Sequence, residues 1–511
     1  MEQFEFIITV NDPMVWDELW EELTIDGLGN NFIPSRDIKV LNDRPFNEYC
    51  AHFSLTVDEA NSIKQDIRVS SIELKASLQD DVYKEFLGKR YGMYDKSQIT
   101  TNDMKNWGLI RATNDTNPFT GTYIRGDYQF SLDGTGVDII VIDSGIEPDH
   151  PEFAVNPDGT GGTRVVDFDW SSLGVSGVYD SEYYGGYLGD SDGHGSHCAS
   201  IAAGNTCGWA SGAAIYSIRI FAGYDIKRNV YLSAIDSDYA FDLVKAFHLR
   251  KLAEGNIRPT ICTNSWGYAA TYSGMQYTVY RGTQYSGGTY NVEYGQVNSR
   301  HPYSINYINA GVNSAAAAGV IMVGAAGNYR HKIDVLGGID YDNYYRYYST
   351  YWGTEDVYYH RGSTPTNASS MICVGAVDSS NVEQKAYFSE TGPRVDVYAP
   401  GVMIMGAYDN SSYITSAVPD PRNSGFYLNK ISGTSQATPQ VTGLLACVLQ
   451  ARPEMTAAEA KEFLHKESLK DRLVVTGAET WTNNTSLQGG ENKILYTPFT
   501  KPVRGNIGSK E

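Results

Sequence analysis

Five short segments of this chain are almost continuously apolar, and they constrain its fold more than any other feature. In chain order these segments are VDIIVID (137–143), AAIYSIRIF (213–221), TICTNSWG (260–267), GVIMVGAAGN (319–328) and MICVGAVD (371–378). Strands of this composition are typical of a parallel sheet that is buried on both faces. Candidate helices separate or follow them at 194–204, 229–254, 303–318, 435–451 and 456–468. The alternation predicts an α/β domain built on a parallel sheet.

The first 75 residues have a different pattern. From residue 4 onward, apolar periodicity indicates the order strand, helix, strand, strand, helix, strand, and the second helix starts with a Thr-x-x-Glu capping box from Thr56 to Glu59. The order βαββαβ is the ferredoxin-like arrangement, which brings two helices onto one face of a four-stranded sheet. We therefore expect a small α+β domain over residues 1–76.

Length and charge narrow the class of protein. A chain of 511 residues is too long for one small core, so one large domain with one or two extra parts is expected. The formal net charge of -20 argues against nucleic-acid binding. The sequence contains no apolar window of about 18 residues, so it predicts no membrane span. The N-terminus lacks a positively charged region followed by an apolar stretch, so we expect an intracellular or virus particle-associated protein rather than a classically secreted one.

Three polar residues lie at the ends of the predicted strands and helices. Asp143 ends the first apolar strand, His194 stands between glycines at the start of a helix, and Ser435 opens another helix. A serine hydroxyl is a poor nucleophile at neutral pH unless a base takes its proton and a third group orients that base. His194 can act as the base and Asp143 as the group that orients it, which predicts nucleophilic chemistry at Ser435.

An oxyanion formed by attack of Ser435 would need hydrogen-bond donors. A helix that starts at Ser435 directs backbone N–H groups and a partial positive charge toward such an anion. Asn328 ends the apolar strand 319–328, and its side-chain amide can supply a further donor. Gly433 leaves room for a substrate because it carries no side chain.

Together these motifs resemble those of the subtilisin-like serine proteases, or subtilases, and are most similar to the proteinase K branch. The matching stretches, in the order of the family, are NWGLIRA (106–112), VIDSGIEPDHPEF (141–153), DGHGSHCAS (192–200), SWG (265–267), AAGN (325–328), MICVGAVD (371–378), RVDVYAPG (394–401) and SGTSQATPQVTG (432–443). The resemblance implies a subtilisin-like three-layer α/β/α catalytic domain over 106–475. A linker at 77–105 would precede it, and a C-terminal extension at 476–511 would follow.

The resemblance also implies an activity and the residues that carry it. The chain would be a serine endopeptidase that hydrolyses polypeptides through an acyl-enzyme, with Asp143, His194 and Ser435 as the triad and Asn328 completing the oxyanion hole. The implied substrate-binding residues form two segments, Ser265, Trp266 and Gly267 at an edge that pairs with the substrate backbone, and Ala325, Ala326 and Gly327 along the P1 pocket.

Maturation and metal binding are further expectations from the resemblance. The N-terminal domain is similar to the propeptide of the family, which inhibits the enzyme within the same chain, and the resemblance places its cleavage site near Ile99–Thr100. No cofactor is implied for the reaction. Asp378 matches a calcium ligand of proteinase K-like relatives, which implies calcium there as a structural ion. We interpret Asp190-Ser191-Asp192-Gly193 as a turn and helix cap rather than a calcium loop.

Tyrosine is the compositional outlier, with 38 residues against 17 Phe and 8 Trp. The tyrosines gather in stretches rich in Tyr, Gly and Asn at 268–302, 330–365 and 405–428. These insertions either pack on the domain or form an interface with a protein partner, because large amphipathic rings suit recognition surfaces. The second interpretation gives an alternative function, a structural or binding component of a larger assembly, such as a virus particle, that retains a protease fold.

Overall fold

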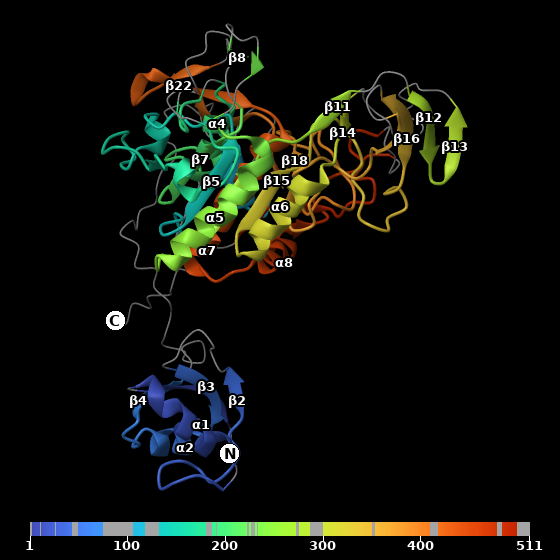
Figure 1. Ribbon diagram of the computed structural model, residues 1–511. Coiled ribbons are helices and arrows are strands. Elements are labelled where there is room, and N and C mark those ends of the chain that lie inside the picture. Colours follow the sequence, from blue (N-terminus) through green and yellow to red (C-terminus); the bar gives the residue numbers. More distant parts are fainter. Residues whose placement is uncertain are drawn as a thin grey trace, which may run out of the picture. The chain divides into compact units, whose positions relative to one another are not determined.

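The chain divides into two compact units, residues Met1–Leu87 and Gly88–Glu511, and each is described by itself (Figure 1). The computed structural model describes residues 3–10, 12–25, 27–42, 50–74, 106–117, 132–179, 186–190, 192–221, 224–225, 230–231, 234–271, 275–286, 300–349, 353–408, 417–477 and 483–497. The expected linker at 77–105, with the cleavage site near Ile99–Thr100, lies outside these residues.

The N-terminal unit has the element order that its sequence predicts. The order is β1 (Phe4–Val10), α1 (Trp16–Thr24), β2 (Val40–Asn42), β3 (Cys50–Leu55), α2 (Val57–Ile63) and β4 (Val69–Leu74). The strands form one antiparallel sheet in the order β2-β3-β1-β4. The capping box is present, because the Thr56 hydroxyl accepts from the Glu59 N–H while the Glu59 carboxylate accepts from the Thr56 N–H. The predicted βαββαβ arrangement is confirmed for the described residues.

A nine-stranded sheet forms the centre of the second unit. Its order is β23 (Leu469–Lys470), β24 (Lys493–Ile494), β19 (Val397–Pro400), β18 (Ile372–Val377), β15 (Ile321–Ala325), β10 (Thr260–Asn264), β5 (Asp138–Asp143), β7 (Ala214–Arg219) and β6 (Val165–Val166). Neighbouring strands run parallel except β23 and β24. All five apolar segments singled out in the sequence become strands of this sheet.

Helices cover both faces of the sheet, which gives three layers (Figure 1). Helices α4 (His194–Ala203) and α7 (Thr434–Ala451) pack on one face, where Ile139 and Val141 of β5 point. Helices α5 (Ala240–Ala253) and α6 (Asn306–Ala317) pack on the other face, against Ile140 and Ile142. The remaining helices are α3 (Trp107–Ala112) and α8 (Ala457–Glu467). The alternation of side chains along each strand explains why these strands are apolar throughout.

Two sequence expectations for this unit are wrong in detail. The helix expected over 229–254 starts only at Ala240, because Ser237–Tyr239 form a separate 3-10 turn and Val230–Tyr231 form β9, which pairs with β8 (Tyr224–Asp225). The extension expected from residue 476 contains β24, which pairs with β19 in the main sheet. The catalytic domain therefore continues past residue 475, since Ile494 is fully buried in this sheet.

The tyrosine-rich stretches form small sheets of their own. Strands β11 (Ala269–Thr271) and β14 (Arg300–Pro302) form a pair, and β13 (Thr283–Ser286), β12 (Met275–Tyr280), β16 (Tyr344–Ser349) and β17 (Gly353–Tyr358) form a four-stranded sheet in that order. Figure 1 shows β12, β13 and β16 beside one end of the catalytic body. Strands β20 (Ile404–Tyr408), β22 (Asn423–Ile431) and β21 (Val418–Asp420) form a third sheet. None of the helices in the described residues is long and apolar enough to cross a membrane.

Candidate active site

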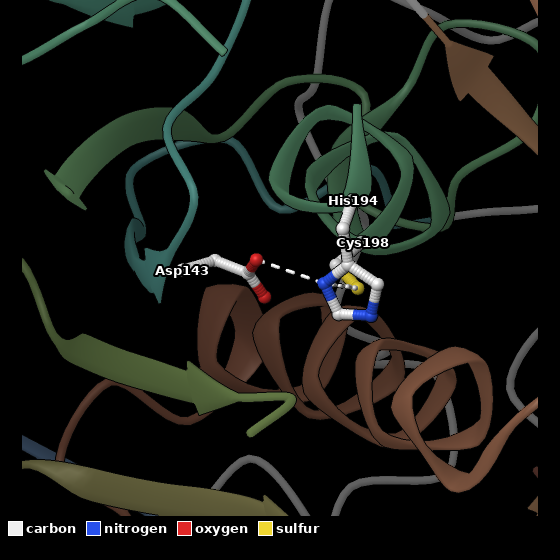
Figure 2. Close-up of side chains that lie close together, drawn as sticks. All are labelled: Asp143, His194 and Cys198. Atoms are coloured by element: carbon white, nitrogen blue, oxygen red, sulfur yellow. Dashed lines mark hydrogen bonds and ion pairs between the residues drawn. The ribbon is translucent and has the colours of Figure 1, made fainter. Parts of the chain in front are cut away.

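Asp143 and His194 are brought together at the carboxyl edge of the main sheet. Asp143 is the last residue of β5 and His194 is the first residue of α4, and the His194 Nδ1 lies 2.8 Å from the Asp143 Oδ1 (Figure 2). Asp143 is buried, whereas the His194 side chain keeps 30% of its surface exposed. The predicted base and its orienting group therefore form a hydrogen-bonded pair that faces solvent on the side of the histidine.

A small polar network fixes the backbone around this pair. The Ser144 hydroxyl accepts from the Gly195 N–H at 2.8 Å and donates to the Asp190 Oδ1 at 2.8 Å. Asp190 also accepts from the N–H groups of Gly193 at 2.9 Å and Ser196 at 2.7 Å. These bonds tie the end of β5 to the start of α4, and they agree with the interpretation of the segment at 190 as a helix cap. Nothing in the sequence singled out Ser144.

The surroundings of His194 favour its protonated form. Burial lowers the pKa of His194, but the Asp143 carboxylate outweighs this effect and holds the pKa above its usual value. The Cys198 Sγ lies 3.9 Å from the His194 Nδ1, behind the ring (Figure 2). Burial raises the pKa of the Cys198 thiol, so the thiol is neutral near pH 7. Asp143, His194 and Cys198 are the only cluster of three metal-type ligands within the described residues.

Ser435 is the second residue of α7, at the same site. Its hydroxyl donates to the Ser265 carbonyl at 2.9 Å rather than to His194. Its own carbonyl accepts from the Ser265 hydroxyl at 2.8 Å and from the Cys198 thiol at 3.4 Å. Cys198 thus contacts both the histidine and the backbone of the serine. Catalytic hydrogen bonds are often long or poorly aligned before the substrate complex forms.

Asn328 lies beside the N-terminus of α7. Its Oδ1 accepts from the Thr434 N–H at 2.8 Å and from the Thr434 hydroxyl at 2.9 Å, which leaves its Nδ2 as the outward donor. A Cβ placed on Gly433 would lie 3.5 Å from this Nδ2 and 3.5 Å from the Ser435 nitrogen. The Gln436 Oε1 would lie closer, at 2.8 Å, so the two predicted oxyanion donors and the Gln436 side chain border the same position beside Gly433.

The predicted substrate-binding segments follow neighbouring strands. Residues 265–267 come directly after β10, and residues 325–327 come at the end of β15, which pairs with β10. Trp266 is only 9% exposed, because its ring packs 6.3 Å from Phe241 and 5.7 Å from Tyr268. The two segments lie at the same sheet edge as the triad residues, as the sequence predicts, but most of the Trp266 surface is turned into the core.

Asp378, the predicted calcium ligand, comes directly after β18. Its Oδ2 accepts from the Gln384 amide at 3.3 Å, and it belongs to no cluster of three metal-type side chains within the described residues. Backbone carbonyls would have to supply the remaining ligands. Calcium at Asp378 stays a prediction.

Comparisons with known proteins identify the family of this chain. The profile of the subtilase family matches residues 134–492. The subtilisin-like serine protease Cur l 4.0101 of Cochliobolus lunatus is 26% identical over 74% of this chain and 56% of its own length. The subtilisin-like serine protease Pen c 2 of Penicillium citrinum is 27% identical over 72% of this chain and 60% of its own length. The chain thus spans less than two thirds of these relatives. The crystal structure of a cold-adapted subtilisin-like serine proteinase matches with a TM-score of 0.47 and 20% identity, over 77% of this chain and 98% of that one.

Proposed function

Because this chain belongs to the subtilase family, we propose that it is a serine endopeptidase that hydrolyses polypeptides through Asp143, His194 and Ser435. The observation that carries the proposal is the bonded Asp143–His194 pair at the end of β5, beside a serine at the N-terminus of α7. The similarity of named subtilisin-like proteases supports the same activity.

The first half of the reaction forms an acyl-enzyme. Since the Nδ1 of His194 is held by Asp143, its Nε2 receives the proton as the Ser435 Oγ attacks the scissile carbonyl carbon. The carbonyl oxygen becomes an oxyanion in the space beside Gly433, where the Ser435 N–H and the Asn328 Nδ2 donate to it. His194 then gives the proton to the leaving amine, and the peptide bond breaks.

The second half repeats these steps with water. His194 takes a proton from the water, which attacks the ester carbonyl, and the same donors stabilise the second oxyanion. The proton returns to the Ser435 oxygen as the new carboxyl product leaves. Segments 265–267 and 325–327 would hold the substrate, with the first providing an edge for an added strand.

We also propose that the N-terminal unit inhibits the enzyme until it is removed. The support is its complete βαββαβ arrangement in front of the catalytic domain, together with the family's propeptide pattern. Intact mass of the wild-type chain before and after incubation tests this proposal. Loss of the N-terminal unit in the wild type, and none in Ser435→Ala, is the expected result.

Hydrolysis is tested with the same pair of chains. Wild-type protein should cleave a denatured protein substrate and react covalently with a fluorophosphonate at Ser435, whereas Ser435→Ala should do neither. Because the hydroxyl is small and its removal leaves the bonds of the Ser435 backbone intact, the variant should keep its fold. Cleavage that persists in Ser435→Ala would refute the assignment of the nucleophile.

A further inference from the structure

Glu390 lies directly behind the turn that carries Asn328. It belongs to a segment that runs beside residues 327–331, where the Glu390 N–H donates to the Gly327 carbonyl at 3.0 Å and the Arg330 N–H donates to the Phe388 carbonyl at 3.0 Å. Only 1% of its surface is exposed. A carboxyl group is rarely buried to this degree unless it has a partner or a function.

The side chain of Glu390 fills the space that a side chain on Gly327 would need. A Cβ on Gly327 would lie 2.4 Å from the Glu390 Cδ and 2.5 Å from its Oε1, and Gly327 has a φ of +123°. The Glu390 carboxyl also accepts from the backbone N–H of Tyr329. It therefore contacts the residue before Asn328 and the residue after it.

The second oxygen of this carboxyl is left without a bond. The Glu390 Oε2 is buried and has no hydrogen-bond partner among the described residues. No ion pair links Glu390 to a cation in the described part of the chain. Burial raises the pKa of Glu390 well above its usual value, which favours the uncharged carboxylic acid over the carboxylate. A neutral acid can pack against Gly327 without placing a negative charge next to the anion that Asn328 must stabilise.

We propose that Glu390 is a positioning residue for the oxyanion hole, because its buried carboxyl holds the backbone of residues 327–329 and so directs the Asn328 amide. Thr434 holds only the Oδ1 of that amide. Glu390 holds the turn from the opposite side through backbone contacts. This inference rests on the proposed function, in which Asn328 donates to the oxyanion.

The test compares substitutions of Glu390 in two backgrounds. Glu390→Met removes the acceptor for the Tyr329 N–H at similar volume, and Glu390→Gln keeps a neutral amide that can still accept. In a chain with Asn328 intact, Glu390→Met should lower kcat at least about tenfold with KM nearly unchanged, because the affected bond forms only in the transition state. Glu390→Gln should restore kcat to within about threefold of the wild type.

The second background carries Asn328→Ala. If Glu390 acts through Asn328, Glu390→Met should change kcat less than about threefold there, since the two effects are not additive. Equal losses in both backgrounds, or an unchanged kcat in Glu390→Met, would overturn the inference. If Glu390→Met does not fold, Glu390→Asp replaces it, because the shorter side chain withdraws the carboxyl from Gly327 and predicts the same split between backgrounds.

Failure of the proposed function would look different. In that case the folded wild-type chain itself would neither hydrolyse substrate nor react with a fluorophosphonate. A wild type that turns over, combined with additive losses from Glu390 and Asn328, would reject only the role of Glu390. Melting temperatures of all variants show whether any loss of kcat follows from unfolding.

Discussion

Replacing Arg422 by Met should destabilise the catalytic domain by about 3 kcal/mol at pH 7, because the substitution leaves two buried carboxylates without their cationic partner. Arg422 lies in the turn between β21 and β22, and β22 leads to the segment that carries Ser435. Its guanidinium bonds the Glu152 Oε1 at 2.5 Å and the Asp420 Oδ2 at 2.6 Å. Both carboxylate side chains are fully buried.

The magnitude follows from the environment of Glu152. Burial alone would raise its pKa, but the Arg422 charge, the Thr206 hydroxyl and the N–H groups of Thr206 and Cys207 outweigh burial and lower the pKa from 4.5 to about 2. At about 1.36 kcal/mol per unit, this difference of about 2.5 corresponds to about 3.4 kcal/mol of stability. Part of this free energy comes from the N–H and hydroxyl donors, which the substitution leaves in place. The substitution also removes the bonds of Arg422 to Asp420, which increases the loss of stability.

The same shift predicts how the effect depends on pH. Since the pKa of Glu152 is lower in the folded chain than in the unfolded one, its contribution is complete above pH 4.5 and is lost as the pH falls toward 2. In Arg422→Met the buried carboxyl can take up a proton, so the difference between variant and wild type should shrink between pH 7 and pH 3.

Urea unfolding of both chains in the Ser435→Ala background, which prevents self-digestion, measures this difference. Arg250→Met is the matched control, because the Arg250 side chain is 46% exposed and pairs with the exposed Glu254 at 3.0 Å. The control should cost less than about 0.5 kcal/mol. A cost below about 1 kcal/mol for Arg422→Met, or a cost that is the same at pH 7 and pH 3, would refute the reasoning.

Four further predictions concern the site and its supports. Gly433→Ala should lower kcat at least about tenfold in a folded chain, because its Cβ would stand 3.5 Å from both oxyanion donors and 2.8 Å from the Gln436 Oε1, which would have to shift; full activity would show that the anion binds elsewhere. Burial lowers the pKa of His194, but the Asp143 carboxylate raises it by more, so the net shift is upward from 6.5. As the pH rises through this ionisation the base loses its proton, so kcat/KM should increase with a midpoint above 6.5; a midpoint below 6 in the pH–rate profile would contradict this. Arg394→Lys should cost about 2–4 kcal/mol in urea unfolding, because one ammonium group cannot replace a guanidinium that bonds three backbone carbonyls and the Asp396 carboxylate. If Asp378 binds calcium, the melting temperature should be higher in millimolar calcium than in chelator, and Asp378→Ala should abolish this difference. Equal melting temperatures of the wild type in calcium and in chelator would refute the prediction.

The apolar strands made most of the catalytic fold predictable. Most residues of the five segments are buried on both faces of the sheet, so their composition alone identifies them as strands of the sheet. Because the strands run parallel, their carboxyl ends meet at one edge, which is where Asp143, Ser265 and Ala325 stand. The residues expected to form the site therefore came together although they are far apart in the chain.

The tyrosine-rich sheets were not predictable in the same way. Strands β12 and β16 pair with each other although α6 and β15 lie between them in the sequence. Neither strand sequence alternates between apolar and polar residues strongly enough to indicate its partner. The inner face of this sheet depends on single residues such as Tyr345, which is fully buried, while Tyr344 on the opposite face packs against Tyr358. Both residues are tyrosines in the same tyrosine-rich stretch, so composition alone cannot show which of them is buried.

Buried polar side chains that bond the backbone were also hard to predict from the sequence. Ser144, Asp190 and Glu390 act on N–H and C=O groups of irregular segments, and a sequence does not show which backbone groups a fold leaves unpaired. Asp190 was recognisable as part of a cap because it stands four residues before the first residue of a helix. Glu390 stands in a loop, and its position under Gly327 exists only in the folded chain.

Two arginines show how this chain orders the loops around its sheet. The Arg164 guanidinium donates to the carbonyls of Ala154, Ala203 and Ala213, and that of Arg394 donates to the carbonyls of Thr366, Ala368 and Met371. These carbonyls belong mainly to turns and helix ends, where no neighbouring strand can supply an N–H, and leaving them unpaired in the interior would cost free energy. One guanidinium offers five donors in a fixed plane, so a single side chain can hold several loop carbonyls at once. Buried donors rather than further strands thus satisfy these loop carbonyls, which is why hydrophobic patterning locates the sheet but not the geometry of the loops.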